Sequence, residues 1–349
     1  MRRATAVLVL AALLAIGGPA AGAAAHQAGH WPRQEFRKVR VPPGMAVYEW
    51  NNPGDLAPDE VRARMRFLRA NGFSTVYLEI GAYLDADELP DSPERDELLR
   101  GIRRQIRRFV ATATRYGLSV QALGGGPDWI VGERRGYLGP KLVELVGDYN
   151  TRVDRSERLK GVHLDLEPYT QEGWLDPAHV EDNLKRYLAT IEEIVATYRS
   201  VLGERGGRGL ELGFAVPFWF DAAGDAPGPV DFGGATKPAV HHLIDLLADL
   251  PGAYLVVMAY RDFTRTSNGS IAHARDEFRY AARIGARSGL IVGQQYGPAP
   301  ADEQHTTFNG QPRSDFRRAA AEITLAFRRY PQFRGLSVDD LDAFMAAGP

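Results

Sequence analysis

Residues 161–169 read Gly-Val-His-Leu-Asp-Leu-Glu-Pro-Tyr, a short run in which polar and apolar residues alternate. Successive side chains of a β-strand point to opposite faces of its sheet, so this alternation predicts a strand. His163, Asp165 and Glu167 would share one face, and the valine and leucines between them would share the other. The run therefore predicts a strand with one ionisable face and one apolar face covered by helices.

Seven further short apolar runs flank this one and alternate with longer helical patterns. The eight predicted strands cover residues 45–49, 75–80, 119–123, 161–166, 211–216, 254–259, 290–293 and 335–338. The predicted helices between them cover residues 58–70, 93–115, 138–150, 177–202, 238–248, 271–286 and 314–330. Alternating βα units predict a parallel sheet, and eight of them predict an α/β protein of the (β/α)8 TIM-barrel class, here spanning residues 44–349 as a single domain. The alternative is an open doubly wound sheet, but no Gly-x-Gly-x-x-Gly turn follows the first strand.

The composition is that of a soluble globular protein with a large core. Of the 349 residues, 44% are hydrophobic and 25% are charged. Lysine and arginine total 42 against 44 aspartate and glutamate residues, so no basic field would hold nucleic acid or an anionic membrane. The absence of cysteine excludes disulfides, thiolate metal sites and cysteine nucleophiles. We expect no nucleic-acid partner and a monomer.

The N-terminus has the features of a secretory signal. Arg2 and Arg3 precede an apolar run over residues 6–17, and small residues follow at 21–25. The alternative is a membrane anchor, but the run is shorter than the about 20 residues that span a bilayer. We therefore expect a signal peptide over residues 1–25 and a flexible lead-in over 26–43. The mature protein would be secreted, extracellular or periplasmic, without membrane association.

Large aromatic residues cluster where the predicted strands end. In a barrel of this class the chemistry lies at the carboxyl ends of the strands, which we call the mouth. Four of the five tryptophans follow predicted strands: Trp50, Trp129, Trp174 and Trp219. Flat rings of this kind, with Tyr169, suit the apolar faces of sugar rings. The alternative is that the rings only cap the core.

The carboxylates of the central run suggest acid–base chemistry. Two carboxyls as close as Asp165 and Glu167 cannot both ionise freely, so the pKa of one should rise. A glutamic acid with a raised pKa is suited to act as a general acid. The alternative is a satisfied polar network that locks the barrel.

The same run resembles the Asp-x-x-Asp-x-Asp-x-Glu signature of family-18 glycoside hydrolases, the chitinase-like barrels, with Asp165 and Glu167 on its last two acidic positions. The resemblance continues in order along the chain. Leu-Gly-Gly-Gly-Pro-Asp-Trp at 123–129 is similar to their third strand end, and Met-Ala-Tyr at 258–260 is similar to their sixth. The His-x-Asp-x-Glu-Pro pattern at 163–168 also resembles the strand-four motif of exported bacterial barrels.

This resemblance implies substrate-assisted hydrolysis of a poly- or oligosaccharide that contains amino sugars. Glu167 would protonate the glycosidic oxygen while the N-acetyl carbonyl of the substrate attacks the anomeric carbon, and Glu167 would then deprotonate water. Asp165 would orient the acetamide, and Tyr260 would donate a hydrogen bond to its oxygen. No cofactor and no metal ion are implied.

The chain also departs from the family pattern. Lys160 and His163 occupy the first two acidic positions of the signature, and Asp339 stands where the eighth strand of the family supplies a tryptophan floor. Asp339 there, with Glu79 and Glu49 at other strand ends, would suit a cationic amine or a polar sugar. A partly deacetylated amino-sugar polymer fits this pattern.

Two alternatives to a glycosidase use the same mouth. One is a metal-dependent hydrolase with His163, Asp165 and Glu167 as ligands, and the other is a secreted carbohydrate-binding barrel without turnover. The residues predicted to bind substrate are His163, Trp50, Trp129, Trp219, Tyr169, Glu79, Gln295 and Asp339.

Overall fold

The structure of the protein is a computed structural model, and it describes residues 44–130, 136–204, 206–221 and 227–349. The predicted signal peptide over residues 1–25 and the predicted lead-in over 26–43 lie outside the described residues. Among the described residues, none of the helices combines the length and apolar composition needed to cross a membrane.

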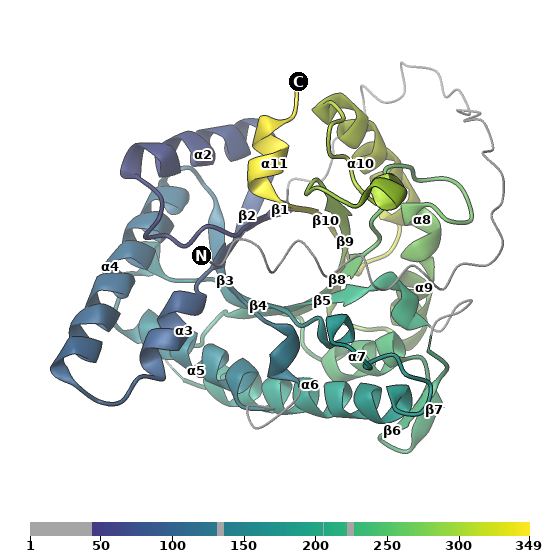
Figure 1. Cartoon of the computed structure of the whole chain (residues 1–349), viewed down its shortest axis with the longest axis horizontal. Coiled ribbons are helices and arrows are strands. Elements are labelled where there is room, and N and C mark those ends of the chain that lie inside the picture. Colours follow the sequence, from purple (N-terminus) through teal and green to yellow (C-terminus); the bar gives the residue numbers. More distant parts are fainter. Residues whose placement is uncertain (1–43, 131–135, 205, 222–226) are drawn as a thin grey trace.

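Eight parallel strands close into a barrel in the order β1-β10-β9-β8-β5-β4-β3-β2 (Figure 1). Every predicted strand is present, and the predicted (β/α)8 TIM-barrel class is confirmed. The strands are β1 Met45–Glu49, β2 Phe73–Glu79, β3 Ser119–Gly124, β4 Gly161–Asp165, β5 Glu211–Pro217, β8 Ala253–Met258, β9 Gly289–Gln295 and β10 Phe333–Asp339.

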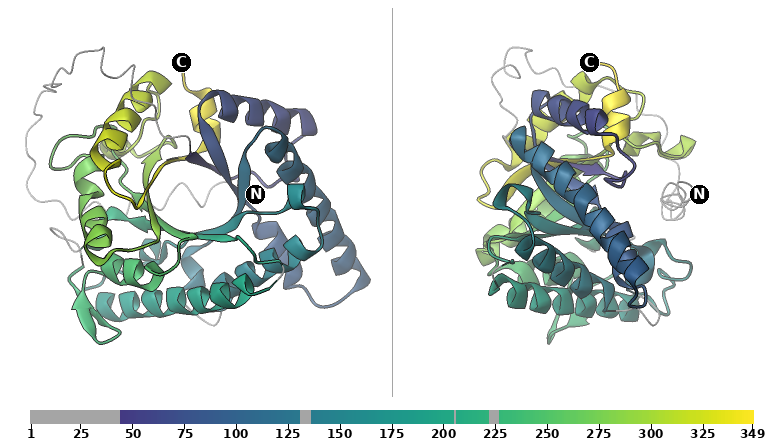
Figure 2. Two further views of the ribbon diagram at one scale, coloured as in Figure 1. Left: turned by 180° about the vertical axis from the view of Figure 1, so that it is seen from behind. Right: turned by 90° about the vertical axis from the view of Figure 1, so that its left-hand side faces the viewer.

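Helices surround the barrel and cover its outer face (Figure 2). Those that connect successive strands are α2 Pro58–Ala70, α4 Pro93–Arg115, α5 Leu138–Thr151, α6 Val180–Leu202, α7 Ala239–Leu247, α9 Arg275–Ile284 and α10 Arg313–Phe327. Local sequence sets several of their ends. The Ser92 hydroxyl accepts a hydrogen bond from the Arg95 amide at the start of α4, and Gly285 ends α9 in the left-handed conformation with φ of 66°.

Shorter elements that the sequence pattern did not predict lie in the connections. They are α3 Gly81–Asp87, α8 Ser270–His273, α11 Leu341–Ala346, the hairpin β6 Val230–Phe232 with β7 Ala235–Lys237, and the 3₁₀ turns η2 Pro127–Trp129, η3 Arg155–Glu157, η4 Pro168–Thr170, η5 Phe218–Asp221 and η6 Ala301–Thr306. The helices and 3₁₀ turns each span about two turns or fewer, and the two hairpin strands have three residues each. Such elements are too short to show a hydrophobic period.

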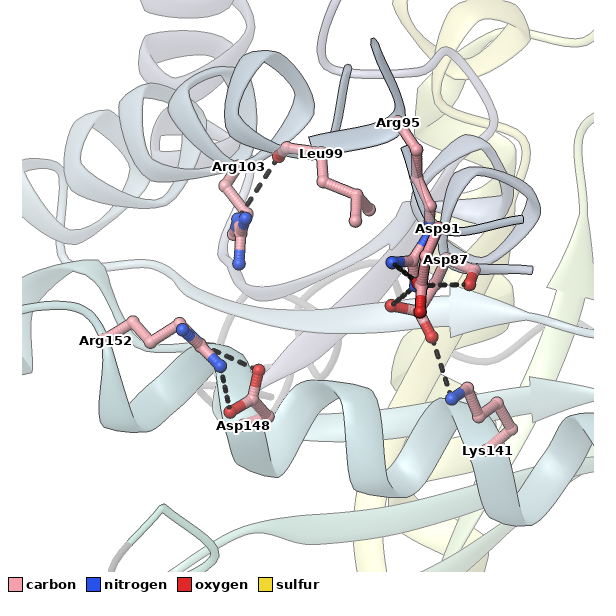
Figure 3. A network of polar contacts seen from close by, with 8 residues as sticks. All are labelled: Asp87, Asp91, Arg95, Leu99, Arg103, Lys141, Asp148 and Arg152. Atoms are coloured by element: carbon pink, nitrogen blue, oxygen red, sulfur yellow. Dashed lines mark hydrogen bonds and ion pairs between the residues drawn. The ribbon is translucent and has the colours of Figure 1, made fainter. Parts of the chain in front are cut away.

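Ion pairs tie α3 to the helices beside it (Figure 3). Asp87 at the end of α3 is paired with Lys141 of α5 at 2.8 Å and with Arg95 of α4 at 3.5 Å. Arg95 also pairs with Asp91 at 2.7 Å. This network fixes the segment that leaves β2, the strand that ends in Glu79.

The predicted alternation along β4 is present. Val162, Leu164 and Leu166 belong to the large apolar core between the sheet and the helices. A second, smaller cluster of buried residues fills the inside of the barrel: Ala46, Tyr48, Tyr77, Leu123, Tyr254, Val256 and Ile291. Its tyrosines surround His163, which lies on the opposite face of β4 from the leucines.

Glu49 does not belong to the mouth, contrary to the expectation from its place at a strand end. Its carboxylate points outward to α2 and accepts a hydrogen bond from the Arg64 guanidinium at 2.8 Å. Glu49 has no exposed surface, and Arg64 also pairs with Glu60 and Asp342. Glu49 therefore binds a helix to the barrel.

The first prediction concerns this buried ion pair. Glu49→Gln should lower the free energy of unfolding by about 2 kcal/mol, because a buried guanidinium loses its most deeply buried counter-charge. Urea denaturation measures the change. Glu60→Gln removes an exposed partner of the same arginine and should cost less than about 0.5 kcal/mol. Equal effects of the two substitutions would contradict the structural role of Glu49.

Candidate functional site

The floor of the mouth is a stack of rings centred on His163. Its imidazole lies parallel to Tyr77, with ring centroids 4.0 Å apart, and to Tyr254 at 5.7 Å. Nε2 is 2.8 Å from the Tyr48 hydroxyl and Nδ1 is 3.2 Å from the Tyr254 hydroxyl. Burial lowers the pKa of His163 to about 3, so the ring is neutral.

His163 has no exposed surface, so its predicted role in substrate binding does not fit its position. The hydroxyls of Tyr48 and Tyr254 occupy both ring nitrogens, which leaves neither free to bind a metal ion. Among the described residues no group of three or more His, Asp or Glu side chains is arranged to hold one. The metal-dependent alternative with His163, Asp165 and Glu167 is therefore not supported by this geometry.

Asp165 and Glu167 lie above this floor and are partly exposed. Asp165 is the next inward residue of β4 after His163, and burial raises the pKa of Asp165, with further contributions from the charges of Glu167, Asp339 and Glu79. Burial also raises the pKa of Glu167. The phenol of Tyr169 donates a hydrogen bond to Glu167 Oε1 at 2.5 Å and partly offsets this rise.

Asp339 lies at the end of β10, four strands from β4 around the ring of eight and therefore on the opposite side of the mouth. The Trp50 indole donates a hydrogen bond from Nε1 to Asp339 Oδ1 at 2.7 Å. Burial raises the pKa of Asp339 to about 7, and the negative charges of Asp340 and Glu167 add to the rise. Trp50 stacks on Tyr48 and keeps 40% of its surface exposed.

Glu79 and Gln295 complete this side of the mouth. Glu79 accepts a hydrogen bond from the Gly81 amide at 2.5 Å, and burial raises its pKa to about 7. Gln295 is opposite Asp339 in the β9–β10 register. Its side chain is 8% exposed, and its Oε1 has no hydrogen-bond partner.

Tyr260 follows β8 and faces the carboxylates. After burial, the charges of Asp339, Asp165 and Glu167 are the causes that raise the pKa of its phenol. A side chain at Gly293 would lie 3.3 Å from the Tyr260 ring, so the glycine leaves room for it inside the barrel. The structure thus brings Tyr260 together with Asp165 and Glu167.

The tryptophans divide into two pairs. Trp129 is 8% exposed and packs on the backbone of Gly126 and Gly124, so it caps the core instead of lining the mouth as predicted. Trp174 is buried as well. Trp219 is partly exposed and meets Tyr169 edge to face at 5.0 Å. Trp50 and Trp219 therefore keep ring surface available to a ligand.

The tyrosines of the floor are functional residues that were not predicted from the sequence. Tyr48, Tyr77 and Tyr254 stand at inward positions of β1, β2 and β8. The signal was available, because each alternates with outward apolar residues in its own strand. These rings decide how deep a ligand can enter.

The carboxylates of the mouth are suited to proton transfer. Four partly exposed carboxylates, Glu79, Asp165, Glu167 and Asp339, have raised pKa values. A carboxyl group with a raised pKa is better suited to act as a proton donor than an ordinary carboxyl group. Glu167 has the added feature of a phenol that can stabilise its ionised form after the proton leaves.

Comparisons with known proteins give distant structural similarities. No protein-family model matches the sequence, and no curated protein matches it. The solved class V chitinase of Nicotiana tobaccum is 16% identical, with a TM-score of 0.36, and the match covers 72% of this chain and 66% of that one. The family GH18 chitinase of Cycas revoluta, in complex with allosamidin, is 14% identical with a TM-score of 0.46, covering 86% and 96%. A glycoside hydrolase family 5 enzyme of Prevotella bryantii B14 is 13% identical with a TM-score of 0.48, covering 84% and 87%.

The second prediction tests the neutral floor. Because the pKa of His163 is about 3 in the folded protein and 6.5 ordinarily, only the unfolded chain takes up this proton as pH falls below 6.5. The free energy of unfolding should therefore fall by about 2 kcal/mol between pH 6.5 and pH 4.5 because of His163. His163→Gln, whose amide can still donate and accept, should remove this part of the pH dependence in denaturation curves.

The matched control is His179→Gln, which changes an exposed histidine. It should retain the pH dependence of the unmodified chain. A His163→Gln variant with that same dependence would show that His163 is not held neutral.

Proposed function

We propose that this chain is a secreted, monomeric glycoside hydrolase that cleaves an amino-sugar-containing glycan by retaining, substrate-assisted acid–base chemistry. The observation that carries the proposal is the convergence of Glu167, Asp165 and Tyr260 above a closed aromatic floor. Trp50 and Trp219 supply exposed ring surface at the same mouth. Aromatic faces beside a few polar groups suit sugar rings.

Glu167 is the group proposed to donate and recover the proton. Burial raises the pKa of Glu167 and so favours the protonated carboxyl, which can protonate the glycosidic oxygen as the bond to the anomeric carbon breaks. In the second step the carboxylate takes a proton from the attacking water. The Tyr169 phenol stabilises the carboxylate that exists between the two steps.

Asp165 and Tyr260 are proposed to act on the acetamido group of the reacting sugar. The carbonyl oxygen of that group attacks the anomeric carbon as the glycosidic bond breaks. Asp165 Oδ1 has no protein partner and is available to accept the acetamide N–H. The Tyr260 phenol can donate to the acetamido oxygen from the end of β8, two strands from β4, and its raised pKa keeps it protonated.

The third prediction tests this assignment with defined oligomers. Glu167→Gln should lower turnover of acetylated amino-sugar oligomers by about a hundredfold or more, because a carboxamide is too weak an acid to transfer a proton to the leaving group. Its affinity for them should change little. New reducing ends measure turnover. Glu172→Gln, an exposed glutamate nearby, is the matched control and should retain full activity.

The substrate panel separates the alternatives. Cleavage should occur only at acetylated residues, resist a chelator and be blocked by a thiazoline analogue. Cleavage of neutral glucans would exclude substrate assistance. Binding without release of reducing ends by the unmodified chain would identify the carbohydrate-binding alternative.

The fourth prediction concerns the pH profile. Tyr169→Phe removes the O–H that lowers the pKa of Glu167, so that pKa should rise further. Because Glu167 must be protonated at the start of the reaction, the alkaline limb of kcat/KM should move to higher pH by about one unit. Tyr137→Phe, at an exposed phenol, should leave the profile in place. An unmoved limb in Tyr169→Phe would mean that another group sets it.

A further inference from the structure

The half of the mouth opposite β4 is built from four neighbouring strands. Trp50, Glu79, Gln295 and Asp339 stand at the carboxyl ends of β1, β2, β9 and β10, which are consecutive around the barrel. None of these side chains has a role in the proton transfers proposed for Glu167. We call this set the acidic half of the mouth.

The acidic half carries negative charge without a protein counter-charge. None of the ion pairs in the part of the chain that the structure describes involves Glu79 or Asp339, and the same holds for Asp165 and Glu167. Their hydrogen-bond donors are neutral: the Gly81 amide for Glu79 and the Trp50 indole for Asp339. The floor contributes no charge, because His163 is neutral.

Gln295 gives a second, independent indication of a ligand. Its side chain is more than nine-tenths buried, stands beside Asp339, and leaves Oε1 without a partner. Gln295 is the last residue of β9, so its side chain stands at the carboxyl end of the barrel. A buried carbonyl oxygen without a donor is unfavourable, and neighbouring carboxylates can accept but not donate. A ligand that brings an N–H donor would satisfy this oxygen.

We infer that the acidic half of the mouth binds the protonated primary amine of a deacetylated amino sugar, with Asp339 and Gln295 as its direct acceptors and Glu79 as further counter-charge. An ammonium carries three N–H donors and one positive charge, which matches an unpaired amide oxygen beside uncompensated carboxylates. The exposed face of Trp50 adds a surface for the sugar and the cation. This inference rests on the proposed function and specifies its substrate as a glycan with free amino groups.

The electrostatics of the mouth agree with such a ligand. Asp339 and Glu79 both have pKa values of about 7, so protons partly occupy them at neutral pH. A bound cation favours the ionised carboxylates. Affinity should therefore weaken as pH falls from 7 to 5, because both groups take up protons and lose their charge.

The fifth prediction uses calorimetric binding by the full chain in its Glu167→Gln form, which keeps oligomers intact. At pH 7, glucosamine oligomers should bind about tenfold tighter than glucose oligomers of equal length. Asp339→Asn should remove most of this difference while changing the affinity for glucose oligomers less than about twofold. The asparagine oxygen still accepts from Trp50, so the pocket keeps its shape.

Two further variants guard against a structural effect. Asp91→Asn removes an equal charge from an almost fully exposed position and should leave all affinities unchanged. Gln295→Met should weaken glucosamine binding selectively, as Asp339→Asn does. Equal affinity for glucosamine and glucose oligomers, or loss of both in Asp339→Asn, would overturn the inference.

The outcome is separable from that of the proposed function. If the unmodified chain binds glucosamine oligomers through Asp339 but releases no reducing ends from any partly acetylated polymer, the hydrolase proposal fails and the amine site stands. If it cleaves acetylated oligomers and Asp339→Asn changes neither binding nor cleavage, the hydrolase proposal stands and the amine site fails.

Discussion

The stack of Tyr77, His163 and Tyr254 closes the barrel and determines what can be built above it. The rings fill the interior at the middle of the strands, and hydroxyls of Tyr48 and Tyr254 satisfy both imidazole nitrogens. Glycines make this layer fit: a Cβ at Gly213 would lie 2.2 Å from the Tyr254 ring. Because inward residues of neighbouring strands form layers, the next inward residues are held at the mouth. Asp165 owes its position to this layer.

The same layer explains the electrostatics of the mouth. A neutral His163 cannot offset the carboxylates above it, and burial then raises their pKa values. One consequence is that burial favours the protonated form of Glu167, the form that general acid catalysis would require. The other is that Asp339 becomes fully charged only when a cation or a rise in pH favours it. The burial of His163 in neutral form therefore affects the pKa values of carboxylates in both halves of the mouth.

Much of this architecture could be predicted from alternation and order along the chain, and the failures have physical reasons. The polar face of 161–169 predicted correctly which residues of β4 point inward. Glu49 shares the parity of Met45 and Val47, so its outward direction was available from the sequence and was overlooked. The position of Trp129 could not be predicted in this way, because Trp129 lies in the turn η2 and its ring packs on glycine backbone. Hydrophobic periodicity does not predict the path of a turn. The depth of His163 was also beyond prediction, because it depends on tyrosines from strands far apart in sequence.

The position of Asp339 gives the site its individual character. The last residue of β10 is a carboxylate, and the Trp50 indole donates a hydrogen bond to it from the end of the adjacent strand β1. An apolar ring there would favour the methyl group of an acetamide, whereas an aspartate beside an unpaired amide oxygen favours an N–H donor with positive charge. Because β10 lies opposite β4, Asp339 and Glu167 interact through their charges, and the hydrogen bond between Tyr169 and Glu167 does not involve Asp339. The amine binding inferred for Asp339 and the proton transfer proposed for Glu167 would thus take place on opposite sides of the mouth.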